Sequence, residues 1–210
     1  LKEEALDYAA ACLERARKEH ARLGTFFRKY GISARFGIPV TPEVTAHVEP
    51  NLRGTLLALA EVYQLQQRPQ SSLECLQHLH RLEPDDVVVK LSLAELLFDS
   101  RPSDRRICQK IIRLAEGVEN ETALHAALLL YKGKALRVLG LNEAARASLT
   151  GALRRKVDRP DELLQALRYE RALAYEALGK KARARSEFEK LYAEVPGYED
   201  LAARLGIDSA

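Results

Sequence analysis

The sequence predicts an all-helical protein built from repeated pairs of helices, and three observations support this fold class. Similar patterns of two short helices recur along the chain, apolar residues within them recur at helical spacing, and glycines or prolines separate many of the periodic stretches. Hydrophobic residues make up 47% of the 210 residues, which is enough to bury a continuous core. We therefore expect one extended helical domain.

Charge and composition argue against several classes of function. The 33 basic and 30 acidic residues nearly balance, so the chain has no general positive field for nucleic acid. It contains no apolar run of the roughly 18 residues that a membrane-spanning helix needs. Cys12, Cys75 and Cys108 are odd in number and far apart, which favours the reducing cytoplasm over a disulfide framework. The opening Leu-Lys-Glu-Glu has no signal-peptide pattern, and we expect a fragment of a longer protein.

Residues 1–52 are expected to form an N-terminal helix followed by a long connection. Apolar residues recur at helical spacing within residues 2–30, as at Leu6, Ala9 and Leu13. Residues 31–50 carry two glycines and three prolines, which predicts an irregular segment with at most one short helix.

The clearest repeat unit runs from Gln165 to Tyr198 and consists of two apolar-periodic helices. Gly179 separates them, because glycine tolerates the positive φ that ends a helix. The unit resembles the tetratricopeptide repeat (TPR) family, in which small residues let paired helices approach, bulky residues fill the space between them, and a proline ends the second helix. The residues that match this pattern are Ala172, Ala184, Tyr175, Phe188 and Pro196.

The same frame fits three further segments, which begin at Arg53, Val87 and Ala126. The unit at Val87 is degenerate, because its second helix fits only with an insertion near Arg101 and Pro102. The four repeats cover residues 53–198, and residues 199–210 are expected to form a C-terminal capping helix and tail. The unit at Ala126 is a second good match, although Val157 replaces the proline; its matching residues are Gly133, Leu136, Gly140, Ala145, Leu149 and Ala152.

Local helix-start signals agree with these frames. Asp85 and Asp86 stand before the helix of the second repeat, and Asn120 and Thr122 before that of the third, as N-cap residues. Pro160 and the two acidic residues after it indicate a further start.

The resemblance implies a right-handed superhelical solenoid of antiparallel helix pairs, whose concave groove is lined by the first helix of each repeat. Such a groove binds a protein or peptide without a cofactor, and we expect an apolar stripe at one position of every repeat. The expected groove residues are Leu57, Glu61, Gln64, Leu91, Glu95, Phe98, Leu130, Lys134, Arg137, Tyr169, Leu173 and Glu176.

Two alternatives bear on this groove. Its apolar stripe, at Leu57, Leu91, Leu130 and Tyr169, can instead be covered by the N-terminal helix or neighbouring repeats. The carboxylate clamp with which some TPR proteins hold chaperone tails is not expected, because acidic Glu61 and Glu170 occupy positions where the clamp has asparagine and a base.

Residues 31–50 raise a related question, because Phe36, Ile38, Val40 and Val44 are apolar side chains outside any repeat. One hypothesis is that the segment folds back over the concave stripe as a reversible lid that competes with a partner. The alternative is that it only packs the N-terminal helix onto the first repeat.

Other local motifs have simpler interpretations. Cys75, His78 and His80 have a metal-like spacing, but no fourth ligand cluster accompanies them and a solvent-exposed helix is expected. His47 and Glu49 repeat half of a deaminase signature by chance, since its cysteine pair is missing. The sequon that begins at Asn120 is explained by helix capping.

The sequence therefore predicts a non-catalytic scaffold for protein interactions, since it shows no phosphate loop, nucleophile elbow or catalytic acid pair. A sensory or regulatory module of a larger protein is the alternative. Nucleic-acid binding is a weaker one: residues 101–190 contain 20 basic and 12 acidic side chains, with a dense run at Arg154, Arg155 and Lys156, but few aromatic residues for base stacking.

Overall fold

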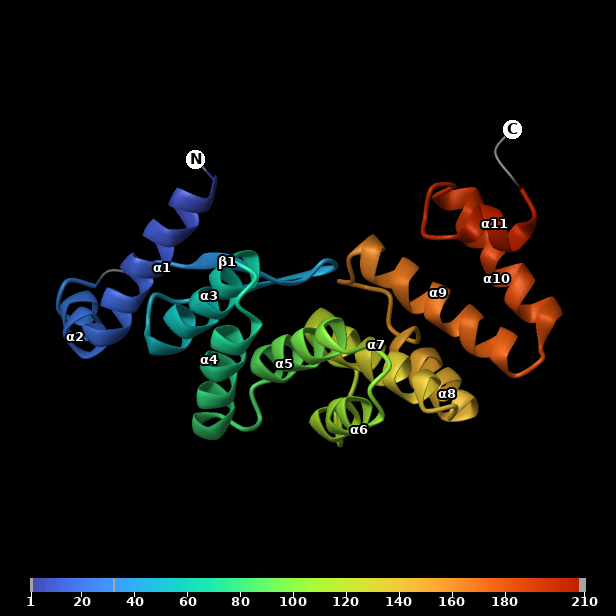
Figure 1. Cartoon of the computed structure of the whole chain (residues 1–210), viewed down its shortest axis with the longest axis horizontal. Helices are drawn as coiled ribbons and strands as arrows, with labels where there is room; N and C mark the ends of the chain where they lie inside the picture. Colours follow the sequence, from blue (N-terminus) through green and yellow to red (C-terminus); the bar gives the residue numbers. More distant parts are fainter. Residues whose placement is uncertain (1, 32, 208–210) are drawn as a thin grey trace. The chain divides into compact units, whose positions relative to one another are not determined.

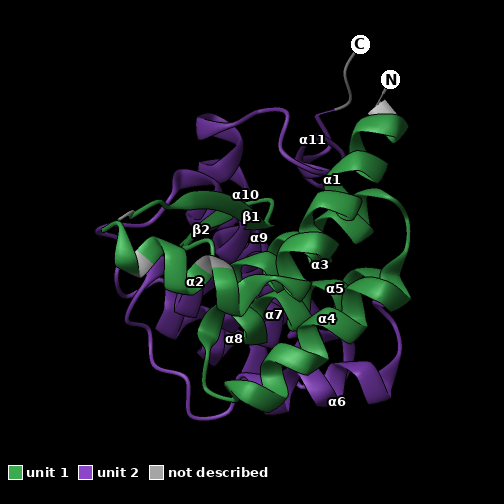
Figure 2. Cartoon of the chain, turned by 90° about the vertical axis from the view of Figure 1, so that its left-hand side faces the viewer, with its two compact units in different colours: residues 1–100 green, residues 101–210 purple. Residues whose placement is uncertain are grey.

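The structure is a computed structural model that describes residues 2–31 and 33–207, and most of these residues are helical (Figure 1). The chain divides into two compact units, Leu1–Ser100 and Arg101–Ala210 (Figure 2). The sequence predicts one extended domain instead. The boundary lies beside Arg101 and Pro102, where the second repeat departs from the common frame, so that repeat is divided between the units.

Unit 1 consists of helices and one β-hairpin. The predicted N-terminal helix is in fact two, because the helix breaks at Glu19. Helix α3 packs against α1, α4 and the first strand of the hairpin. The elements are α1 (Lys2–Lys18), α2 (His20–Lys29), β1 (Phe36–Thr41), β2 (Val44–Val48), α3 (Leu52–Leu65), α4 (Pro69–Leu82) and α5 (Val87–Ser100).

The hairpin corrects two expectations, a purely helical chain and an irregular segment over residues 31–50. Strands β1 and β2 pair antiparallel, with Phe36 opposite Val48 and Ile38 opposite Ala46. Every second residue points inward, which leaves Ile38, Ala46 and Val48 buried and the residues between them exposed. This alternation is visible in the sequence, but the glycine and prolines around it hide the strands. Pro39 is tolerated because the sheet has only two strands.

The hairpin joins α3 through a close backbone contact. Asn51 caps the helix, and its side-chain oxygen accepts a hydrogen bond of 2.9 Å from the Gly54 amide. A Cβ atom at Gly54 would lie 2.0 Å from the carbonyl oxygen of Glu49, so only glycine fits there. This contact fixes the end of β2 against the first turn of α3.

All the regular secondary structure of unit 2 within its described residues, 101–207, is helical, with turns and loops between the helices. Helix α7 packs against α6, α8 and α9, while α9 also packs against α8 and α10. The elements are α6 (Arg105–Leu114), α7 (Ala123–Val138), α8 (Asn142–Ala152), α9 (Asp161–Ala177), α10 (Lys181–Glu194) and α11 (Leu201–Leu205).

The small residues expected between paired helices of unit 2 are buried there. A Cβ atom at Gly133 would lie 2.6 Å from the Leu149 side chain, so glycine lets α7 and α8 approach closely. In the next pair, Ala172, Ala184 and Phe188 belong to one buried cluster. These packing positions are confirmed.

The predicted helix ends are confirmed in part. Gly179 has a φ of 73° at the end of α9, and the Asp86 carboxylate accepts a hydrogen bond from the Val88 amide at the start of α5. Thr122 occupies the N-cap of α7 but makes no side-chain capping bond. Asn120 instead donates to the carbonyl oxygens of Gly151 and Ala152, so it caps the end of α8.

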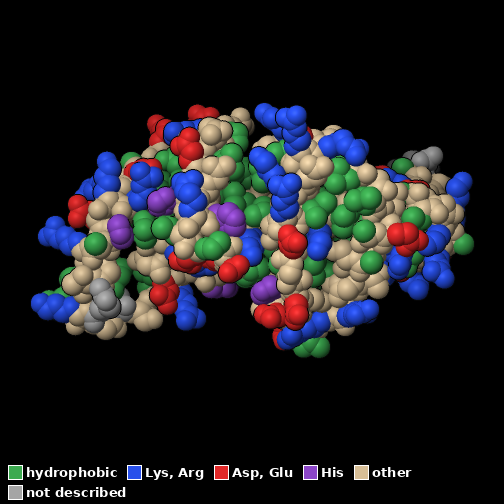
Figure 3. Space-filling view, turned by 90° about the horizontal axis from the view of Figure 1, so that it is seen from below, with side chains coloured by type: hydrophobic (Ala, Val, Ile, Leu, Met, Phe, Trp, Pro, Cys, Tyr) green, Lys and Arg blue, Asp and Glu red, His purple; other side chains and the backbone are tan. Residues whose placement is uncertain are grey.

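The surface carries both signs of charge. Figure 3 shows Lys, Arg, Asp and Glu side chains interspersed on the face seen from below, with hydrophobic side chains between them. Within the described ranges, none of the helices has both the length and the apolar character to cross a bilayer.

Candidate functional site

The predicted apolar stripe is not exposed in unit 1. Leu57 on α3 is 3% exposed and Leu91 on α5 is fully buried. Strand β1 packs against both helices, so the segment before the first repeat lies on them (Figure 1). The expectation of an accessible stripe is therefore wrong here, because both leucines belong to the buried core.

The other expected groove residues of unit 1, Glu61, Gln64, Glu95 and Phe98, are only partly accessible. Burial raises the pKa of the Glu61 carboxyl, because the charged form loses hydration there.

The third repeat also lacks an exposed stripe. Leu130 is fully buried in α7. The Lys134 ammonium lies 4.8 Å from the centre of the Tyr131 ring, and the Arg137 guanidinium is 3.0 Å from the Glu170 carboxylate. The two expected bases of this repeat are thus occupied within unit 2.

The expected groove residues of the fourth repeat contact the C-terminal segment, residues 198–205. The Tyr169 hydroxyl donates a hydrogen bond to Asp200, and the Glu176 carboxylate lies 2.6 Å from Arg204. Leu173 packs against the cluster that contains buried Leu201. Tyr169 and Leu173 are half-buried as a result, so no open apolar stripe exists on α9. A role of the twelve residues in partner binding stays a prediction.

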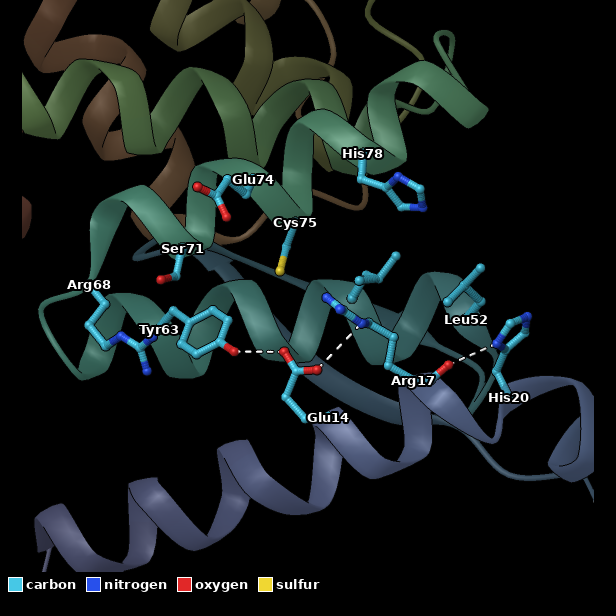
Figure 4. Close-up of a pocket in the computed structure, with 11 residues that line it drawn as sticks. Glu14, Arg17, His20, Leu52, Tyr63, Arg68, Ser71, Glu74, Cys75 and His78 are labelled. Carbon is cyan, nitrogen blue, oxygen red and sulfur yellow. Dashed lines mark hydrogen bonds and ion pairs between the residues drawn. The ribbon is translucent and has the colours of Figure 1, made fainter.

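The structure does contain an open pocket in unit 1, of about 590 Å³, between α1, α3 and α4 (Figure 4). Glu14 links two of the helices: its carboxylate accepts a 2.8 Å hydrogen bond from the Tyr63 hydroxyl and lies 3.4 Å from Arg17. The guanidinium of Arg68 stacks over the Tyr63 ring at 4.7 Å. Glu74 and His78 of α4 are exposed at the opposite wall (Figure 4).

Two groups of the pocket, a thiol and a phenol, have raised pKa values. Burial raises the pKa of the Cys75 thiol to about 11, so it stays protonated at neutral pH and is a poor nucleophile. Burial, together with the hydrogen bond to Glu14, raises the pKa of Tyr63 to about 12. Across residues 2–31 and 33–207, the structure has no group of three or more His, Cys, Asp or Glu side chains that could hold a metal ion. This arrangement can hold polar and charged groups by hydrogen bonds and ion pairs.

Sequence reasoning missed this pocket because its walls come from separate segments. Of the three residues with metal-like spacing, which were expected on a solvent-exposed helix, His78 is exposed and lines the pocket, Cys75 lies buried at its wall, and His80 is not among the lining residues. The one available signal is on α1, where Glu14 and Arg17 are three residues apart and share a helix face. Nothing in the sequence pairs that face with Tyr63.

Some basic residues of unit 2, the part of the chain that raised the question of nucleic-acid binding, form ion pairs with acids within the described residues, but Arg154, Arg155 and Lys156 are not among them. Exposed ion pairs of this kind are a solvated surface rather than a free positive patch. Those in ion pairs are Arg137, Arg146, Arg168, Arg171, Lys180, Arg185 and Arg204. Nucleic-acid binding stays untested.

Comparison with known proteins gives a structural neighbour. No protein-family model and no curated protein sequence matches the chain. The chain is similar in structure to the N-terminal domain of the EccA1 ATPase from the ESX-1 secretion system of Mycobacterium tuberculosis, with a TM-score of 0.68 and 19% sequence identity. The similarity covers 94% of this chain and 71% of the other. At this level of identity, it shows a shared fold.

Proposed function

We propose that the chain is a non-catalytic scaffold of the TPR type, a right-handed solenoid that binds a protein or peptide. One observation carries the proposal: the small residues of the repeat frame, among them Gly133, Ala145, Ala172 and Ala184, are buried in the packing of the helix pairs of unit 2. Stacked helix pairs expose long helical surfaces, and proteins of this architecture use such surfaces for binding.

The chemistry of the Figure 4 pocket supports binding over catalysis. Its thiol is protonated at neutral pH, and its Glu14 carboxylate is already engaged by Tyr63 and Arg17. Arg68 and His78 are exposed beside it and suit the polar side chains of a peptide.

A second candidate function follows from the structural neighbour. EccA1 is named as an ATPase of a secretion system, and the similar part is its N-terminal domain. In this second candidate, the chain is the recognition or regulatory module of a larger protein, and its role is to bind another protein. Both candidates require a saturable protein interaction, so one experiment tests both.

The experiment is affinity capture on the immobilised intact chain, followed by calorimetric titration of each captured protein after purification. The proposed function predicts at least one protein that binds saturably with simple stoichiometry. Heat-denatured chain on the same support is the control for adsorption. If every captured protein fails to saturate, or if the chain turns over a substrate and one polar substitution abolishes turnover without unfolding it, the scaffold function is wrong.

A further inference from the structure

An open groove of about 740 Å³ runs along α7 and α8 in unit 2. Leu129 and Leu136 of α7 form its apolar floor. Along one wall, α8 presents small residues at Ala144, Ala147 and Gly151, whose spacing places them on one helix face. Both alanines are exposed, so no described segment of the chain covers them.

Close packing holds the two helices in place. Leu149 of α8 fits against Gly133 of α7, and the Ser148 hydroxyl donates a 3.4 Å hydrogen bond to the Leu129 carbonyl. The floor and wall therefore form one rigid surface. Because side chains on the wall are small, a third helix can approach α8 near the lower end of the usual 8–10 Å range of interaxial distances.

The groove has a positive end. Arg154 and Arg155 follow α8 directly, are exposed and line the groove, and Lys132 lies on its floor. In the part of the chain that the structure describes, none of these three side chains forms an ion pair with an acid, and Glu119 is the acid among the lining residues. Lys132 is held by a hydrogen bond of 3.2 Å to the Ala115 carbonyl.

A further basic residue, the buried Arg159, adds to the positive charge near this end of the groove. Arg159 is more than nine-tenths buried, donates a 3.0 Å hydrogen bond to the side-chain oxygen of Asn120, and has no partner at its Nε atom. Burial and the nearby charge of Arg155 lower its pKa. Asn120 also lines the groove and binds the last carbonyls of α8, so the positive end is built on a fixed loop.

We propose that the α7–α8 groove binds an amphipathic helix of a partner protein, whose apolar face covers Leu129, Leu136 and Ala147 and whose acidic end meets Arg154 and Arg155. This inference rests on the proposed function and names its surface and partner class. It differs from the groove that the sequence predicts, because the bound face contains the second helix of a repeat. Figure 3 shows hydrophobic side chains exposed alongside Lys and Arg side chains on the face seen from below.

The geometry also sets the direction of the bound helix. Acidic residues are favoured in the first turn of a helix, where the peptide dipoles leave partial positive charge. A helix lying antiparallel to α8 places its first turn beside Arg154 and Arg155, which follow the C-terminal end of α8. Helix α8 has 11 residues and is about 16 Å long, so the bound helix needs roughly three turns.

Single-stranded nucleic acid fits this surface less well than a helix does. Base stacking needs aromatic side chains, and the residues that line the groove include none. Their alanines, leucines and glycine are suited to contact with aliphatic side chains.

The test begins with peptides selected from a random library of helical 16-residue sequences on the intact chain. The affinity of each selected peptide is then measured by fluorescence anisotropy. Two groove variants are compared with wild type: Ala147→Glu, which places a charge on the wall, and Arg154→Glu with Arg155→Glu, which reverses the positive end. Ala144→Glu replaces Ala147→Glu if circular dichroism shows that the latter does not fold.

Matched controls come from the next repeat. Ser186→Glu introduces the same charge at the exposed position of α10 that corresponds to Ala147, and Lys181→Glu with Lys190→Glu reverses two exposed bases there. We expect each groove variant to weaken binding about tenfold or more and each control to change it by less than about twofold. Selected sequences should share an apolar helix face with acids in the first turn, and their binding should weaken with added salt.

Either of two results obtained with selected peptides would overturn the inference without touching the scaffold function. In the first, the selected peptides bind with equal affinity to wild type and to both groove variants. In the second, the selected peptides lack acidic residues. A selection that yields no saturable peptide also overturns it, and the capture experiment then decides the scaffold function separately.

Discussion

The two units protect the same kind of helix face by different means. In unit 1, an apolar hairpin packs on α3 and α5, with Ile38, Val40 and Val44 buried. In unit 2, the C-terminal segment joins α9 by a hydrogen bond from Tyr169 and an ion pair at Glu176, beside a buried cluster. The comparison shows that segments outside the repeats pack on helices that carry expected groove residues and occupy some of those residues within the chain.

The largest expected effect is loss of the aromatic core under the C-terminal segment. Phe188 is 3% exposed, and its ring lies near the Tyr169 ring and the Arg204 guanidinium. Phe188→Ala should lower the free energy of unfolding of unit 2 by about 3–5 kcal/mol, because it leaves a cavity. Urea unfolding followed by circular dichroism measures this. Tyr8→Ala, at an exposed position of unit 1, should have little effect; equal losses for both variants would contradict this account of the core.

Two glycines, one in each unit, sharpen the comparison. Replacing each by alanine should change the free energy of unfolding in opposite directions in the two units. Gly54→Ala drives a methyl group into the Glu49 carbonyl and should destabilise unit 1 by about 1–3 kcal/mol, despite alanine's higher helix propensity. Gly151→Ala in α8 meets no atom within 4 Å and should stabilise unit 2 by about 0.5–1 kcal/mol. Thermal unfolding of both variants decides this. A stabilising Gly54→Ala would show that the hairpin does not press on α3.

The helix pairs could be predicted from sequence because their signals are local. Gly179 lies between two periodic stretches, and the small residues at Gly133 and Ala172 occupy the same position in two successive repeats. The hairpin was missed because its two stretches of alternating apolar residues are short. One of them also contains Pro39, a residue that is uncommon in strands. Its two-stranded sheet is stable only through tertiary packing on α3 and α5.

The candidate sites were much harder to predict. Exposure of Leu57 or Leu130 depends on segments far away in sequence, and no periodic pattern reports what will cover them. The Figure 4 pocket requires Glu14 to meet Tyr63 from 49 residues away. The α7–α8 groove was missed for another reason: its alanines appear as ordinary helix formers, and Arg154 and Arg155 were considered only as part of a basic run for nucleic acid.

Alkaline pH should lower the free energy of unfolding of both units, through the ionisation of one tyrosine in each. Burial raises the pKa of Tyr63 and of Tyr169 from 10.0 to about 12, so the folded state keeps a proton that the unfolded state loses. Their contribution is complete below pH 10.0 and is lost as the pH rises towards about 12. We expect Tyr63→Phe and Tyr169→Phe to reduce the fall in unfolding free energy across this window, each in its own unit, as measured by urea unfolding at several pH values. An unchanged slope in both variants would contradict the burial of these hydroxyls.

The smallest effect should come from ion pairs, and the two units should differ here too. Arg204 and Glu176 of unit 2 are partly exposed, so a double-mutant cycle with Arg204→Gln and Glu176→Gln should give a coupling of about 0.2–1 kcal/mol that falls with added salt. In unit 1, Arg53 binds Asp86 through two nitrogens, and the Asp86 side chain is only 9% exposed and also caps α5. The cycle with Arg53→Gln and Asp86→Asn should therefore give a larger coupling, since a planar two-point pair shielded from water is weakened less by solvent and salt. Equal couplings with equal salt dependence would show that the Arg53–Asp86 pair is as solvated as the one at the C-terminal segment.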